Sequence, residues 1–330
     1  MTIKSKISGK DRFKYVQSLN NKFIKENKGT NLRIRDIAER LQVSEAELLC
    51  LGINSSVNFL KFTDINIFFK NILILDKVMF LTRNDEAVHE MSCKSSQIST
   101  SYDKVLTIKY LKEILLILNH HSIKYIFSED KKIKNRALRS FQLFNSSGQA
   151  ILKIYDKSDN ASQFYKIINN FKIDFSYQLK INPDPKSASS NIIHINFLNN
   201  FYSNNFKKNN SYKRKRIANI RFLRELLLLC SKAQFNLGIY VPSYSSLQFY
   251  HGKIKKIVDF KSWLNILDPS FNLHIKENKN NNYADVYYSD IGFHINYLSI
   301  NENIFLSTYA KYDLKKSKNY YIREFISELL

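Results

Sequence analysis

The first third of the chain changes from segments with helical apolar spacing to segments in which apolar and polar residues alternate. The spacing predicts a helix over 10–28, a helical hairpin over 34–52 and a helix over 64–75. Ser44 followed by Glu47 is typical of a capping box, so the second helix of the hairpin begins at Glu45. Alternation predicts strands over 78–82 and 87–91, whereas the apolar spacing of 105–118 is helical or mixed.

A β-hairpin is predicted over 139–155, with its turn at 145–148, and a helix follows over 161–171. The segment INPDPKSASSN, residues 181–191, holds two of the four prolines and is the best linker candidate. After it the same kinds of segment recur. They are helices over 194–202, 217–232 and 320–330, a basic segment over 207–216, and strands over 237–241, 247–250, 253–260, 271–276, 284–288, 292–299 and 304–310.

One offset relates the ends of the two halves. Tyr155 and Tyr309 each end a predicted strand, and 309 − 155 = 154; Phe171 and Phe325 each lie in the helix that follows, and 325 − 171 = 154. An offset that fits a strand and a helix together is typical of a duplicated unit. The sequence therefore predicts repeats over 1–180 and 192–330, joined by the linker.

The net charge of +22, from 51 basic and 29 acidic residues, favours an anionic partner such as nucleic acid, a membrane surface or a carboxylate ligand. The lysines are spread along a chain rich in Asn and Ile, however, which favours compositional drift over a nucleic-acid surface. The chain has only 7 Gly and neither a GxGxxG nor a GxxxxGK[ST] segment, so dinucleotide and P-loop signatures are absent.

The cysteines and the hydropathy pattern indicate the cellular compartment in which the protein is expected. Three cysteines, far apart and without a CxxC pair, form neither a disulfide framework nor a metal motif. The start, MTIKSKISGKDRFKY, has no apolar run typical of a signal peptide, and no apolar stretch reaches the roughly 18 residues that a membrane helix needs. We therefore expect a cytoplasmic protein without a membrane span.

The hairpin 34–52 has the spacing of a helix-turn-helix, which makes a DNA-binding regulator one alternative. A reading helix should offer Arg, Lys, Asn or Gln to base edges. Here Glu45 and Glu47 open the second helix and would repel phosphates. This pattern favours a structural hairpin, and no specific nucleic-acid partner is expected.

The seven histidines show no HExxH spacing, which disfavours a structural zinc site. A single histidine can still hold a heme iron, since the porphyrin supplies the other four nitrogens. Spacing alone selects none of them.

Several segments resemble the hemin-degrading, heme-utilization family of the HemS/ChuS type, from about residue 12 to the end. They are IRDIAERLQVSEAEL (34–48), TRNDEAVHE (82–90), FQLFNSSGQAILKIYDKSDN (141–160), LGIYVPSYSSLQFYHGKIKKIV (237–258) and SWLNILDPSFNLHIK (262–276). The resemblance implies an α+β fold of two homologous repeats, each a large antiparallel β-sheet packed with helices. It also implies one heme, held between the sheet of the second half and helices.

The resemblance also implies site residues. His194, in NIIHINFL, stands at the position of the axial iron ligand, and Lys207 or Lys208 at that of a propionate contact. Lys109 stands where the family has an arginine on the opposite face of the heme, and Tyr309 matches a tyrosine near the C-terminus. Tyr312 replaces a family arginine, so the oxygen chemistry of the site is in doubt.

The function implied is heme-iron acquisition, either by oxidative degradation with iron release or by carriage and buffering of heme without degradation. Degradation would take electrons from an external donor, because the sequence shows no reductase site. A heme-uptake transporter and a downstream heme acceptor are the protein partners that the resemblance suggests.

Overall fold

The computed structural model describes residues 9–28, 32–133, 136–174, 181, 213–218, 220–276, 282–312 and 319–329. The chain forms two compact units. Unit 1 consists of Met1–Val78 and His120–Ser189, and unit 2 consists of Met79–Asn119 and Ser190–Leu330. None of the described helices is both long and apolar enough to cross a bilayer.

The strands form two antiparallel sheets of nine strands each. Sheet A has the order β1-β7-β8-β9-β2-β3-β15-β14-β13, and sheet B has the order β10-β16-β17-β18-β11-β12-β6-β5-β4. The α+β fold expected from the sequence is confirmed.

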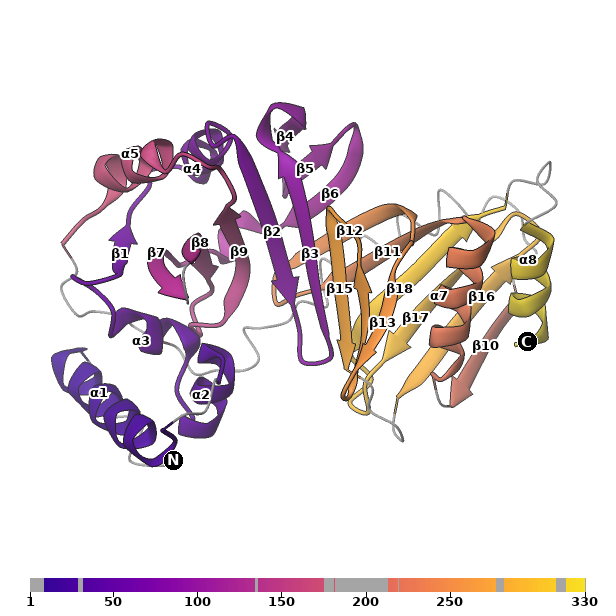
Figure 1. Cartoon of the computed structure of the whole chain (residues 1–330), viewed down its shortest axis with the longest axis horizontal. Coiled ribbons are helices and arrows are strands. Elements are labelled where there is room, and N and C mark those ends of the chain that lie inside the picture. The colour runs from indigo at the N-terminus through magenta and orange to yellow at the C-terminus, as the bar shows by residue number, and fades with distance from the viewer. Residues whose placement is uncertain are drawn as a thin grey trace. The chain divides into compact units, whose positions relative to one another are not determined.

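Unit 1 packs helices on both faces of a four-stranded part of sheet A. Its strands are β1 (Val57–Leu60), β7 (Tyr125–Ile133), β8 (Arg136–Phe144) and β9 (Ala150–Asp156). Its helices are α1 (Gly9–Glu26), α2 (Ile34–Leu41), α3 (Glu45–Cys50), α4 (Ile65–Ile72) and α5 (Ser162–Phe171), with a 3₁₀ turn η3 (His120–Ser122). Figure 1 shows α1, α2 and α3 gathered together, apart from α4 and α5.

Phenylalanines attach α4 and α5 to one face of these strands. Phe141 of β8 lies 5.9 Å from Phe68 of α4 and 4.8 Å from Phe164 of α5, measured between ring centroids. The opposite face is covered by α3, whose Ala46, Leu49 and Cys50 share a core with residues of all four strands. Both faces of this part of sheet A are therefore closed by helices.

Ion pairs hold the start of α3 in place. Ser44 caps the helix with Glu47, as the sequence predicts. Glu47 is 2.7 Å from Arg12, and Glu45 is 3.2 Å from Lys153 of β9. Every α3 residue from Ala46 to Cys50 is buried, so α3 has no free face for a DNA groove, and the regulator alternative loses its structural basis.

Unit 2 contains all of sheet B and the rest of sheet A. The strands from the first half are β2 (Lys77–Arg83), β3 (Ala87–Lys94), β4 (Ile98–Tyr102), β5 (Leu106–Tyr110) and β6 (Glu113–Leu118), with a 3₁₀ turn η2 (Ser95–Gln97). Those from the second half are β10 (Lys213–Ala218), β11 (Asn236–Pro242), β12 (Ser246–Lys253), β13 (Ile257–Phe260), β14 (Trp263–Leu267), β15 (Phe271–Lys276), β16 (Tyr283–Ser289), β17 (Gly292–Leu298) and β18 (Ile304–Lys311).

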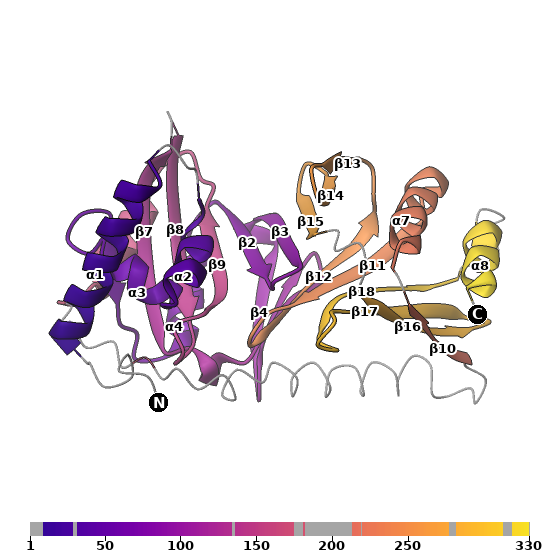
Figure 2. The ribbon, with the colours of Figure 1, turned by 90° about the horizontal axis from the view of Figure 1, so that it is seen from below.

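Two described helices, α7 (Phe222–Ala233) and α8 (Asn319–Glu328), cover one face of sheet B. Figure 2 shows both on the same side of β11 and β16–β18. Leu226 of α7 and Ile326 of α8 are fully buried in a core that includes Ile239 of β11 and Ile295 of β17. Since side chains alternate along a strand, the residues between these point to the opposite face.

The duplication is confirmed in the strand register. In β8 and β9, Ser140 pairs with Tyr155; in β17 and β18, His294 pairs with Tyr309, so the offset of 154 is preserved in the pairing itself. The two sheet orders also correspond strand by strand, from β1 and β10 to β13 and β4.

The repeats exchange a three-stranded segment. In unit 2, β6 of the first half pairs with β12 of the second, and β15 of the second half pairs with β3 of the first. The strands β4–β6 thus complete sheet B, and β13–β15 continue sheet A. Residues 79–119 consequently belong to unit 2 although they precede the expected linker, of which only Ile181 is described.

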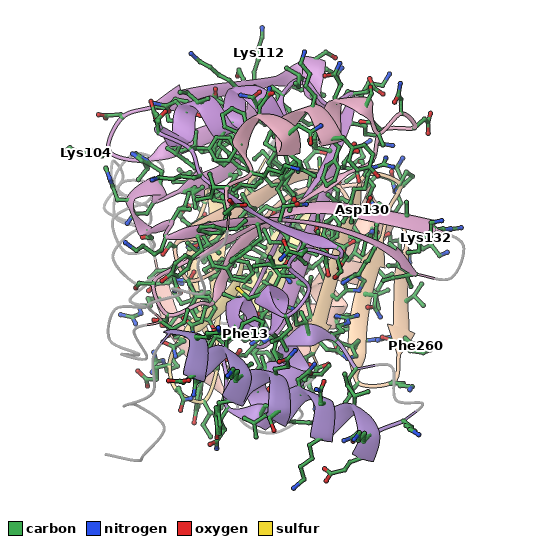
Figure 3. All side chains as sticks on the ribbon, turned by 90° about the vertical axis from the view of Figure 1, so that its left-hand side faces the viewer. Phe13, Lys104, Lys112, Asp130, Lys132 and Phe260 are labelled. Carbon is green, nitrogen blue, oxygen red and sulfur yellow. The ribbon has the colours of Figure 1, made fainter. Side chains whose placement is uncertain are left out.

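Three sequence expectations were wrong. The strand expected over 253–260 is interrupted, because β12 ends at Lys253 and β13 begins only at Ile257. Residues 105–118 form the hairpin of β5 and β6, because Leu111 and Lys112 turn the chain with positive φ angles of 51° and 74°. Such a turn is normally made by Gly or Asn, so its signal is missing from the sequence; Lys112 points into solvent there (Figure 3). The expected helix over 217–232 begins only at Phe222, because Ile217 and Ala218 complete the edge strand β10.

Candidate functional site

The face of sheet B opposite α7 and α8 carries two rows of directly paired residues that cross six strands. We call it the polar face. In the order β10, β16, β17, β18, β11, β12, the first row is Arg214, Tyr287, His294, Tyr309, Gly238 and His251. The second row is Arg216, Asp285, Asn296, Ser307, Tyr240 and Phe249.

A buried hydrogen-bond network joins the middle of the two rows. The hydroxyl of Tyr240 lies 3.2 Å from Nε2 of His294 and donates to Oδ1 of Asn296 at 3.4 Å. Ser307 donates to the same Oδ1 at 2.7 Å. Tyr240 and His294 are fully buried, so the hydrogen-bond network holds their rings in fixed positions in the middle of the polar face.

The ring of Tyr309 occupies the space beside Gly238. A Cβ atom on Gly238 would come within 2.3 Å of the Tyr309 ring, so a larger residue cannot stand there without moving the ring. Burial and, second to it, the charge of Glu113 raise the pKa of Tyr309 to about 12. The phenol is therefore neutral near pH 7 and can donate a hydrogen bond.

Arginines line the β10 end of the polar face. The guanidinium of Arg214 lies 5.4 Å from the ring centroid of Tyr287. Arg216 donates to both carboxylate oxygens of Asp285, at 2.9 and 3.1 Å. Burial acts to raise the pKa of Asp285, but the hydrogen bonds and charges of Arg216 and Arg214 outweigh it and hold this pKa below its ordinary value.

A model of the Haemin-degrading HemS.ChuX domain matches residues 42–171, from α3 to the end of α5. Residues 42–171 therefore form a domain of the HemS/ChuX family. The chain is 22% identical over 268 residues to the hemin transport protein HmuS of Yersinia pestis. The aligned region covers 74% of this chain and 76% of that protein. The hemin transport protein HemS of Yersinia enterocolitica is 22% identical over 267 residues, with the same coverage.

Solved structures show the HemS/ChuX fold over almost the whole chain. The heme degrading enzyme ChuS of Escherichia coli O157:H7 matches with a TM-score of 0.75 and 18% identity, covering 95% of this chain and 98% of that one. Holo-PhuS, a heme-binding protein from Pseudomonas aeruginosa, matches with a TM-score of 0.74 and 17% identity, covering 94% and 96%.

Of the family positions expected from the sequence, Lys109 and Tyr309 lie on the polar face. Lys109 is exposed on β5, two residues after Thr107, which pairs with Ile117 of β6. Ile117 and Tyr240 belong to one small core, and Tyr309 packs against this core. Thr107 and Lys109 therefore lie on the same face of the sheet as Tyr309. Four strand spacings separate β5 from β18, or roughly 19 Å along the sheet. His194 and Lys207 lie outside the described residues.

Of the two rows of the polar face, sequence reasoning selected only Tyr309 and missed the others, among them Gly238, Tyr240, His251 and His294. A signal exists in the i, i+2 spacing of Gly238 with Tyr240, Phe249 with His251 and His294 with Asn296. It becomes informative only once the strand register is known, because the same residues could face opposite sides of unrelated strands.

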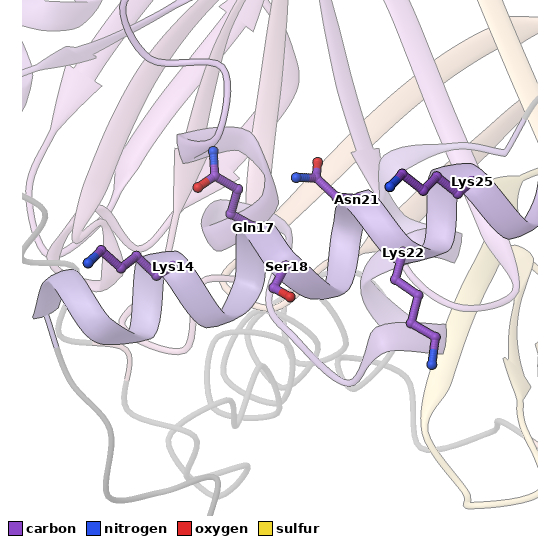
Figure 4. Close-up of a pocket in the computed structure, with 6 residues that line it drawn as sticks. All are labelled: Lys14, Gln17, Ser18, Asn21, Lys22 and Lys25. Atoms are coloured by element: carbon purple, nitrogen blue, oxygen red, sulfur yellow. The ribbon is translucent and has the colours of Figure 1, made fainter.

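A pocket lies on α1 (Figure 4). This hollow of about 440 Å³ is lined by Lys14, Gln17, Ser18, Asn21, Lys22 and Lys25. All six side chains are polar, and none offers the aromatic or aliphatic surface on which a large planar ligand packs. The hollow does not fit a porphyrin, whereas the polar face combines aromatic rings with cations.

Proposed function

We propose that this protein binds heme on the polar face of sheet B and serves heme-iron utilization. One observation carries the proposal. Lys109 and Tyr309 are 200 positions apart (309 − 109), and they share one sheet face because β4–β6 of the first half join the sheet of the second. The match of residues 42–171 to the Haemin-degrading HemS.ChuX domain supports the same ligand.

The chemistry of the polar face suits an iron porphyrin. The partly exposed rings of Tyr287 and Tyr309 supply aromatic surface for the macrocycle, which gains most of its affinity from apolar burial. Lys109 and Arg214 are exposed cations on the same face and can pair with the propionates. The neutral phenol of Tyr309 can add a hydrogen bond to a propionate oxygen.

His194 as the axial iron ligand and Lys207 as a propionate contact complete the proposal. Neutral imidazole is a suitable fifth ligand for heme iron. Both residues were expected from the family resemblance in the sequence and lie outside the described residues.

For the reaction, we propose oxidative ring opening with iron release. Bound heme would itself supply the oxygen chemistry, and the chain would hold the propionates and orient the ring. Electrons would come from an external donor. Carriage or buffering of heme is the alternative, and the names of the hemin transport relatives favour it.

Hemin titration of the purified protein tests the binding proposal. A saturable Soret band is expected, and His194→Ala should shift this band and weaken binding about tenfold or more. His121→Ala is the matched control, since His121 is an exposed histidine of unit 1 and its loss should change neither. A chain that leaves the hemin spectrum unchanged would refute heme binding.

Turnover separates degradation from carriage. With a chemical reductant and oxygen, a degrading protein loses its Soret band and releases iron to a chelator. A carrier keeps the band and passes heme to an apo-hemoprotein. Complete retention of heme iron over many hours under reducing, aerated conditions would exclude degradation.

A further inference from the structure

Tyr240 and His294 form a buried pair in the middle of the polar face. The hydroxyl of Tyr240 lies 3.2 Å from Nε2 of His294, and neither side chain is exposed to solvent. The contacts proposed for heme come from exposed or partly exposed side chains of this face, so they involve neither member of the pair. The chemistry of the pair is therefore a separate question from the binding of the ligand.

The pair has the arrangement that makes a phenol easy to oxidise. A tyrosine that loses an electron becomes a strong acid, and its hydroxyl proton has to pass to a base. The base must lie within hydrogen-bond reach of the phenol, and Nε2 of His294 does. When the imidazole hydrogen is on Nδ1, Nε2 has a lone pair and can accept this proton. Tyr240 can then give up one electron without leaving a positive charge on its own ring.

Aromatic rings connect the pair to the outside of the polar face. The ring centroid of Tyr240 is 6.3 Å from that of Tyr309, and the ring centroid of His294 is 6.1 Å from that of Tyr287. Tyr287 and Tyr309 are partly exposed, whereas Tyr240 and His294 are fully buried. A ligand that lies against the two outer tyrosines is thus one ring away from Tyr240, and an electron has only a short path to cross.

Two features favour Tyr240 over the outer tyrosines as the place where oxidation ends. The guanidinium of Arg214, 5.4 Å from the ring centroid of Tyr287, opposes the loss of an electron from that ring, because like charges repel. A radical on Tyr287 or Tyr309 would also meet solutes, since both rings are partly exposed. The ring of Tyr240 is shielded from them and has an imidazole beside its hydroxyl.

We propose that Tyr240 is a redox-active residue that returns one electron to heme oxidised by hydrogen peroxide. The inference rests on the proposed function and adds a protective step to it. Hydrogen peroxide takes two electrons from ferric heme as its O–O bond breaks. One electron then passes from Tyr240 to the heme, the phenol O–H bond breaks, and an N–H bond forms at Nε2 of His294. The products are a neutral tyrosyl radical, an imidazolium and a heme that has regained one electron.

Electron paramagnetic resonance of the hemin-loaded full chain, frozen soon after hydrogen peroxide is added, tests the proposal. Wild type should give a tyrosyl radical signal. Tyr240→Phe should lose this signal and keep the hemin Soret band, because only the oxidisable hydroxyl is removed. Tyr297→Phe is the matched control, since Tyr297 is also fully buried but lies 3.2 Å from the hydroxyl of Thr308 instead of an imidazole. This variant should keep the wild-type signal, and a signal that persists in Tyr240→Phe would overturn the inference.

Two further measurements leave the hydroxyl in place. Fluorotyrosine introduced at position 240 should split the radical signal through its fluorine, and an unsplit signal would place the radical on another residue. Nitrogen NMR of the hemin-free chain should show Nε2 of His294 without a hydrogen, and a protonated Nε2 would exclude it as the acceptor. A wild-type chain that binds hemin but forms no tyrosyl radical would overturn this inference alone. A chain that binds no hemin would overturn the proposed function together with it.

Discussion

The same strand positions carry chemically different side chains in the two repeats. In unit 1, Ser140 and Tyr155 occupy the places that His294 and Tyr309 occupy in unit 2. Where Phe59 faces Phe127 in the first repeat, Arg216 faces Asp285 in the second. Ser140 and Phe127 are buried in the first repeat, and His294 and Asp285 are buried in the second, so the two copies differ in the chemistry of these side chains rather than in their burial.

The two copies also differ in the partners of their buried polar groups. In unit 1, Lys153 pairs with Glu45 of α3, and Gln142 donates to Glu129 at 2.9 Å. These polar groups are buried and have partners on the neighbouring elements. In unit 2, the equivalent face carries a buried network of Tyr240, His294, Asn296 and Ser307. A duplicated sheet can thus carry ion pairs to a covering helix in one repeat and a network within the sheet in the other.

The largest loss of stability is expected when α3 loses its buried ion pair to the sheet of unit 1. Lys153 and Glu45 are only 8% and 11% exposed, so Lys153→Ala should destabilise unit 1 by about 3 kcal/mol, as removal of one member of a buried ion pair does. Far-UV circular dichroism in urea should show an earlier transition, while the fluorescence of Trp263 in unit 2 should not. Hemin binding at low denaturant should stay as in wild type.

Lys131→Ala is the matched control for Lys153→Ala. Lys131 bonds Glu129 at 2.8 Å from a side chain that is 37% exposed, so its loss should cost at most about 1 kcal/mol. Equal destabilisation by the two variants would show that α3 does not depend on its buried pair.

A comparable effect is expected from crowding the polar face. Gly238→Val places a side chain where the Tyr309 ring lies, and overpacking of this kind costs about 2 kcal/mol. Adding Tyr309→Ala to Gly238→Val should recover most of that stability, because the two positions are coupled. Thermal unfolding of the single and double variants measures the coupling, and additive losses would contradict the contact.

The helix-covered side of unit 2 is expected to respond to pH. His89 is fully buried beside Phe271, neither of its ring nitrogens is hydrogen-bonded to a described residue, and burial lowers its pKa to about 3. The unfolded chain binds a proton near pH 6.5 and the folded chain does not, so stability falls as the pH drops below 6.5. Between pH 7 and pH 5 the loss should be about 2 kcal/mol.

His89→Leu removes this titration and checks the origin of the pH effect. Urea denaturation at pH 7 and pH 5, followed by Trp263 fluorescence, should show a smaller pH dependence in the variant by that amount. An unchanged difference between the two pH values would place its origin elsewhere.

The smallest effect concerns Lys109. Because the side chain is exposed, Lys109→Ala should weaken hemin binding only about threefold, or less than 1 kcal/mol. Lys109→Arg should bind at least as tightly as wild type, since a planar guanidinium can bond both oxygens of a carboxylate. Isothermal titration with hemin measures both, and a loss of binding in the arginine variant would exclude a carboxylate contact.

Much of the fold follows from local signals. The Ser44 cap, the strands on both sides of residues 145–148 and the offset between Tyr155 and Tyr309 all correspond to features of the structure. These features depend on nearby residues or on a repeated pattern, and both are visible in a single sequence. The hairpin at Leu111 and Lys112 was missed because its turn uses residues that normally avoid positive φ.

The exchange of strands could not be predicted from the sequence. Nothing in β4–β6 specifies that β6 pairs with β12, since an alternating strand fits any apolar edge. The residues of the candidate site could not be predicted for the same reason, because they come together only through this strand pairing. Tyr309 and Lys109 were selected through the family resemblance, whereas Tyr240 and His294 became candidates only when the register placed both of their strands beside β18.

The exchanged strands also set an order of events during synthesis. His89 of β3 pairs with Leu273 of β15, which the ribosome makes 184 residues later (273 − 89). At a translation rate of about 5–20 residues per second, that edge of β3 waits roughly 10–40 s for its partner. Unit 1, by contrast, has its last described helix once residue 171 has emerged. The amino-terminal unit can therefore fold while the ribosome is still working, and unit 2 must wait for nearly the whole chain.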